Sequence, residues 1–123
     1  MHAETLARGA YGRPDTSLRD LRGLEYDLLA RSTSALRAGG TEGADFPTLA
    51  RAIDQNLRLW SALAADLADP ANALPNELKA RLFYLFEFTL QHSRQVLDGN
   101  AKVGVLVDIN TAVMRGLRGG AGT

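Results

Sequence analysis

Glu87 and His92 are the residues of this chain whose types could most readily support acid–base chemistry. Both lie in RLFYLFEFTLQHSRQVL, residues 81–97, where the apolar density of the sequence is highest. A carboxylate enclosed by apolar side chains can act as a general acid. On a helical projection, however, Glu87 falls on the side opposite the apolar stripe. We therefore expect Glu87 to be solvated and assign no catalytic residue.

The sequence also lacks the residues that zinc sites, nucleophile elbows and phosphate-binding loops require. His2 and His92 are the only histidines, and the chain has no cysteine, so the usual zinc ligand sets cannot form. No Gly-x-Ser-x-Gly nucleophile elbow occurs, and the glycine-rich segment AGGTEG (38–43) has no following Lys-Ser or Lys-Thr. We expect no enzyme activity, no cofactor and no metal, and expect His92 to pack or to form a hydrogen bond near a helix end.

The charge balance argues against two broad classes of partner. Lys plus Arg and Asp plus Glu number 14 each, so no overall basic field attracts nucleic acid or an anionic membrane. The longest apolar run is too short to span a bilayer, and the first residues lack the apolar segment of a signal peptide. The sequence is therefore expected to be that of a cytoplasmic protein.

Gly, Pro, Asn and Asp divide the chain into helical segments. Strand signals are nearly absent, and the one β-branched cluster, KVGVLV (102–107), is interrupted by glycine. Helices are predicted over 18–37, from an N-cap at Asp45 to Asp69, from Pro75 to Gly99, and over 103–117. Together with a short helix at about 3–11, they predict an all-α, up-and-down bundle of four main helices in a single domain, residues 1–123, with short mobile ends.

The third predicted helix has an unusually wide apolar face. Its apolar arc covers roughly 200°, about twice that of an ordinary surface helix. Three explanations are open: a central helix with three neighbours, an exposed remainder that binds a partner, or a catalytic pocket. Phe83 widens the arc on one side and Phe88 on the other. The first explanation is favoured, and the third is the weakest because Glu87 lies outside the arc.

The last helix carries Asn110 in the middle of its apolar face. A buried amide has to be hydrogen-bonded or it costs about 1–3 kcal/mol. An internal bond to a neighbouring helix is the favoured interpretation, and pairing with the backbone of a bound peptide is the alternative. Trp60 lies at the centre of its own helical stripe, where core packing is favoured over a role as an interface anchor.

The sequence resembles the FlaF family of flagellar proteins from alphaproteobacteria. The resemblance begins with LARGAYG (6–12), and it is most specific in two blocks, LWSALAADLADPANALPNELKARLFYLFEFTLQHSRQVLDG (59–99) and INTAVMRGLRG (109–119). Residues 13–55 match more loosely. Leu90-Gln91 stands before His92 where a more basic pair is expected, which weakens any detailed role for charge on that helix.

This resemblance implies a role in flagellum assembly, in which family members act with flagellin and against the translational regulator FlbT. It suggests a cytoplasmic chaperone that covers the assembly-prone helices of flagellin until export. The alternative is a post-transcriptional regulator that acts through FlbT or flagellin mRNA. The wide apolar arcs are also compatible with a homo-oligomer when the partner is absent. Our hypothesis for the partner contacts comprises Phe83, Phe88, Val107, Asn110 and Met114, with Arg115 and Arg118 at the rim.

Overall fold

The computed structural model describes the backbone of residues 14–119 and the side chains of residues 25–116. Within that part the chain forms four α-helices and no strand: α2 (Pro14–Gly39), α3 (Phe46–Ala68), α4 (Asn76–Leu97) and α5 (Gly104–Gly119). The predicted all-α bundle of four main helices is confirmed. The short helix predicted at about 3–11 lies outside the described residues.

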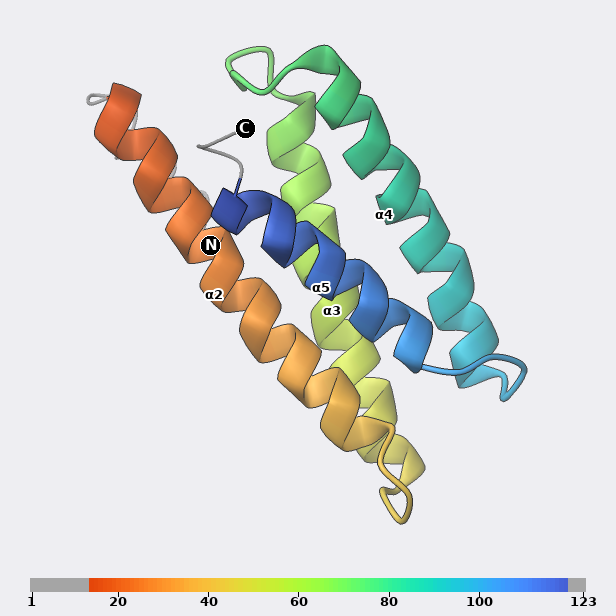
Figure 1. The fold of residues 1–123 in the computed structure, drawn as a ribbon. Coiled ribbons are helices and arrows are strands. Elements are labelled where there is room, and N and C mark those ends of the chain that lie inside the picture. The colour runs from red at the N-terminus through yellow and green to blue at the C-terminus, as the bar shows by residue number, and fades with distance from the viewer. Residues whose placement is uncertain (1–13, 120–123) are drawn as a thin grey trace.

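Short connections make consecutive helices antiparallel (Figure 1). α2 packs extensively against both α3 and α5, whereas α4 packs against α3 and makes only a small contact with α5. α4 has no extensive contact with α2. The interpretation of α4 as a central helix with three neighbours is therefore wrong, and its wide apolar arc faces fewer partners than expected.

The ends of the helices confirm the predicted punctuation, with one exception. The side chain of Asp45 accepts a hydrogen bond from the backbone N–H of Thr48 at 2.9 Å and caps α3. α4 ends at Leu97, and Gly99 follows its C-cap with a φ of +79° that allows the backbone N–H of Asn100 to reach the Gln95 carbonyl at 2.8 Å. The exception is α2, which begins at Pro14 and not at residue 18, since proline is tolerated in the first turn of a helix.

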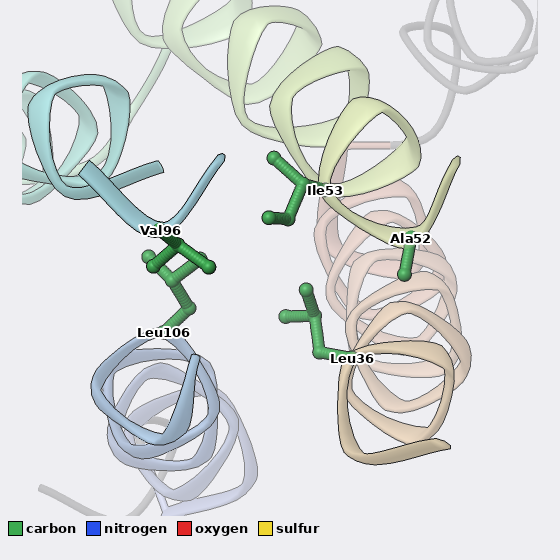
Figure 2. Packing of buried hydrophobic residues seen from close by; sticks show 5 residues of the cluster. All are labelled: Leu36, Ala52, Ile53, Val96 and Leu106. Atoms are coloured by element: carbon green, nitrogen blue, oxygen red, sulfur yellow. The ribbon is translucent and has the colours of Figure 1, made fainter. Parts of the chain in front are cut away.

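The core consists of two apolar clusters at opposite ends of the bundle. In the first, side chains from all four helices point toward one another (Figure 2): Leu36, Ala52, Ile53, Val96 and Leu106. The second surrounds Trp60, which is fully buried against Leu29 and Val113. The predicted core position of Trp60 is confirmed.

A polar layer separates the two clusters. Each helix contributes to it from positions that lie between its residues in the first cluster and those in the second: Ser32 and Thr33, Asn56, Thr89 and Ser93, and Asn110. All six side chains are buried. The bundle thus has a polar section at mid-height, with an apolar section on either side.

Candidate functional site: an apolar face on helix α4

The most deeply buried residues of helix α4 have small side chains. Its fully buried residues are Thr89, Ser93 and Val96, and two of these three carry hydroxyl groups. Its larger apolar side chains are only partly buried: Leu82, Phe83, Leu85, Phe86 and Leu90. The helix therefore leaves much of its apolar surface in contact with solvent, which follows from its having one extensive neighbour.

One side of α4 combines this apolar surface with an open hollow. Residues 81, 84, 85 and 88 follow the i, i+3, i+4, i+7 spacing of a single helix face. Tyr84 is 68% exposed and Phe88 is 38% exposed. A shallow hollow of about 440 Å³ lies beside them, lined by Ala80, Arg81, Tyr84 and Leu85. We refer to Ala80, Arg81, Tyr84, Leu85 and Phe88 as the Tyr84–Phe88 face.

Two contacts fix side chains at the edges of the Tyr84–Phe88 face, one at Phe88 and one at Arg81. The ring of His92 stacks on Phe88 with 5.6 Å between centroids and an interplanar angle of 13°. His92 Nε2 lies 2.8 Å from the carbonyl oxygen of Lys102, and because a carbonyl only accepts, Nε2 carries the proton. Packing and a hydrogen bond near the helix end were predicted for His92 and are confirmed. At the other edge, Arg81 pairs with Glu77 at 2.7 Å in an exposed ion pair.

Three residues of the mid-height polar layer, Ser32, Asn56 and Asn110, form a hydrogen-bond network whose orientation is set by Trp60. The indole N–H of Trp60 can only donate, and it donates to Asn110 Oδ1 at 2.9 Å. Asn110 must then donate from Nδ2, to Asn56 Oδ1 at 2.8 Å. Ser32 donates to the same oxygen at 2.9 Å. The internal hydrogen bond favoured for Asn110 is therefore present, and this side chain is fully buried.

The structure places the hypothesised contact residues in different surroundings. Phe88 belongs to the Tyr84–Phe88 face, whereas Phe83, five residues earlier, is rotated from it by about 140°. Val107 and Met114 are partly buried and pack against the first and second apolar clusters. The Met114 sulfur also lies 3.8 Å from the hydroxyl of Thr33 on α2.

The charged rim of the hypothesis is described only in part. Arg115 is exposed on α5, and the side chain of Arg118 lies outside the described residues. The hypothesised set is therefore not a single surface: Phe88 and Arg115 are accessible, while Asn110 is enclosed by the core. A partner that binds to the surface of this structure can contact Phe88 but cannot reach Asn110.

Sequence reasoning missed Tyr84 and the extent of the polar layer. Tyr84 stands four residues before Phe88, so an aromatic pair at helical spacing was visible and could have been singled out. Asn56 was also visible as an amide between Ile53 and Trp60 within an apolar stripe. Its partners were not visible, because Asn110 is 54 residues away.

The described residues show neither a metal-ligand cluster nor a membrane-spanning segment. No group of three or more His, Asp or Glu side chains in residues 25–116 could hold a metal ion. None of the helices in the described part of the chain is both long and apolar enough to cross a membrane.

Comparison with known proteins identifies the family. No match is found among curated proteins or among solved structures. The family model described as flagellar protein FlaF matches residues 7–117, which include all the side chains described by the structure. This match covers most of the 123 residues and agrees with the resemblance of residues 59–99 and 109–119. The chain therefore belongs to the FlaF family of flagellar proteins.

Proposed function

We propose that this flagellar protein is a cytoplasmic chaperone that binds flagellin and supports its production and secretion. The observation that supports binding is the Tyr84–Phe88 face, since Tyr84 is 68% exposed beside an open apolar hollow. Tyrosine and phenylalanine are enriched in the cores of protein interfaces. The absence of an evident catalytic arrangement among the sequence motifs favours binding over catalysis.

The proposed mode of binding is a helix laid against a helix. An amphipathic helix of flagellin would place an apolar side chain in the hollow and others against Tyr84 and Phe88, with anchors at i, i+3, i+4 and i+7 spacing. The exposed Arg81 and Glu77 lie along the same edge and would contribute mainly to orientation, because exposed ion pairs add little binding energy. Phe83 and Arg115 remain proposed secondary contacts. Val107, Asn110, Met114 and Arg118 are not used in this mode.

Co-expression with flagellin followed by size-exclusion chromatography tests the proposal. We expect one peak that contains both chains at micromolar concentrations. Tyr84→Ala and Phe88→Ala should each weaken the complex about tenfold or more, as expected for truncation of a central aromatic contact. Circular dichroism should show that both variants keep the helical content of the parent.

The matched control is Phe46→Ala. Phe46 is an exposed aromatic residue at the first position of α3, 57% exposed, and lies outside the Tyr84–Phe88 face. We expect this variant to bind flagellin like the parent. Separate elution of the parent protein and flagellin at micromolar concentrations would reject direct chaperone activity, and would leave regulation through FlbT or flagellin mRNA as the function to be tested.

A further inference from the structure

Three buried polar atoms of the mid-height layer have no hydrogen-bond partner among the described protein atoms: Asn56 Nδ2, Thr89 Oγ1 and Ser93 Oγ. All three residues are fully buried, with 0% of their surface exposed. Unpaired buried groups are rare because each one loses its hydrogen bonds to water on folding. A single small polar partner between the helices would satisfy all three atoms.

The three atoms lie at the same height of the bundle. On α3, Asn56 is between Ile53 of the first cluster and Trp60 of the second. On α4, Thr89 and Ser93 are between Val96 of the first cluster and Phe86, which packs against the second. Thr89 and Ser93 are also four residues apart and therefore lie on one face of the helix. That face carries the buried residues of α4, and the main neighbour of α4 in the bundle is α3.

The network orientation leaves the Nδ2 group of Asn56 available to α4. Asn56 Oδ1 accepts hydrogen bonds from Ser32 on α2 and from Asn110 on α5. The Nδ2 group is the other branch of the amide, and it has no hydrogen-bond partner on these two helices. The remaining helix packed against α3 is α4. The amide cannot be turned around, because Asn110 would then present its Nδ2 donor to a second donor.

We propose that the α3–α4 interface contains a binding site for one ordered water molecule, formed by Asn56 Nδ2, Thr89 Oγ1 and Ser93 Oγ. The water oxygen accepts from Asn56 and from one hydroxyl, and a water hydrogen is donated to the other hydroxyl. Buried waters in proteins typically make about three such bonds. The polar layer then connects all four helices, and the water fixes the register of α4, a helix whose large apolar side chains are only partly buried. This inference does not depend on flagellin binding.

A crystal structure at a resolution that defines ordered solvent gives the direct test. The expected result is one solvent peak within about 3.2 Å of Asn56 Nδ2 and of both hydroxyl oxygens. The inference is overturned if no peak is present there and the two hydroxyls donate instead to backbone carbonyls of α4. That alternative already occurs elsewhere in the bundle, where Thr33 Oγ1 donates to the Leu29 carbonyl at 2.6 Å in its own helix.

A double-mutant cycle gives an independent test in solution. Thr89→Val and Ser93→Ala each remove one partner of the water with little change in volume. Each should raise the unfolding equilibrium constant about fivefold or more. The double variant should be less destabilised than the product of the two effects, by about fivefold, because the second substitution acts on a water site already lost. Unfolding in urea is followed by the fluorescence of Trp60.

The matched control cycle pairs Thr33→Val with Ser93→Ala. Thr33 is also buried, and its hydroxyl contacts the Leu29 carbonyl of α2 and the Met114 sulfur of α5. Neither partner lies on α4, so these two effects should multiply independently. Independent effects in the Thr89–Ser93 cycle as well, or an increase in stability on Thr89→Val, would contradict a shared water.

Discussion

At the scale of single residues, the interior of this protein contains buried amide groups with specific hydrogen bonds beside its apolar side chains. Trp60 can donate only through its indole N–H, and that single constraint orients Asn110 and then Asn56. The three side chains are fully buried. A substitution at one of these positions therefore leaves a buried polar atom of a neighbouring side chain without its hydrogen bond.

Replacing Asn110 by Leu should destabilise the protein by about 2–3 kcal/mol, since a leucine leaves the Trp60 N–H without an acceptor and removes a donor from Asn56 Oδ1. The free energy of unfolding is measured in urea. Gln91→Leu is the control, because Gln91 is an exposed amide on α4 and its substitution should change stability by no more than about 0.5 kcal/mol. Equal effects of the two substitutions would show that the buried network adds no stability.

The Asp45 carboxyl should make the stability of the bundle depend on pH in the acidic range. Hydrogen bonds from Thr48, with a smaller contribution from the Arg51 charge, hold the pKa of the Asp45 carboxyl below its usual value. A group whose pKa is lowered by folding stabilises the protein above its unfolded pKa, near about 4, and loses this contribution as the pH falls through the folded pKa. Asp45→Asn keeps a capping side chain but does not titrate. The parent should lose stability relative to this variant below about pH 4, and parallel stability curves would contradict the assignment.

At the scale of helices, replacing glycine by alanine should change the stability of the protein in opposite directions at two positions. Gly99 has a φ of +79° at the end of α4, so Gly99→Ala should destabilise by about 1 kcal/mol. Gly116 is an exposed glycine within α5, and an added Cβ there would meet no atom within 4 Å. Gly116→Ala should therefore stabilise by about 0.5–1 kcal/mol. Thermal unfolding followed by circular dichroism measures both, and a change of the same sign in both variants would refute the contrast.

The helices themselves could be predicted from sequence because their signals are local. Asp45 caps α3, and Gly99 follows the C-cap of α4 with a positive φ. The neighbours of α4 could not be predicted, because the width of an apolar arc does not specify how many helices cover it. The Tyr84–Phe88 face stays exposed because α4 lacks the third helical neighbour that was predicted for it. The hypothesised contact set failed to form one surface for the same reason, since Phe83 and Phe88 widen the arc on opposite sides.

At the scale of the whole molecule, α4 connects the interior to the proposed binding surface. Its inner side contributes Thr89 and Ser93 to the polar layer, and its outer side carries Tyr84 and Phe88. Polar groups specify a position more strictly than apolar ones, because they require partners at fixed distances. The arrangement therefore allows α4 to keep a defined position while a large part of its apolar surface stays available to a partner.

The two candidate functions predict different salt dependence of binding, because the molecule has no net charge. Lys plus Arg equals Asp plus Glu at 14 each, and the Tyr84–Phe88 face is mainly apolar. Binding to flagellin should therefore show a negative heat-capacity change, and its Kd should change by less than about tenfold between about 50 and 200 mM salt. Calorimetric titration at several temperatures and salt concentrations measures both. Direct binding to flagellin mRNA would instead weaken by several orders of magnitude over that salt range, since phosphate contacts release counterions. A strong salt dependence for RNA together with no heat of binding for flagellin would favour the regulator over the chaperone.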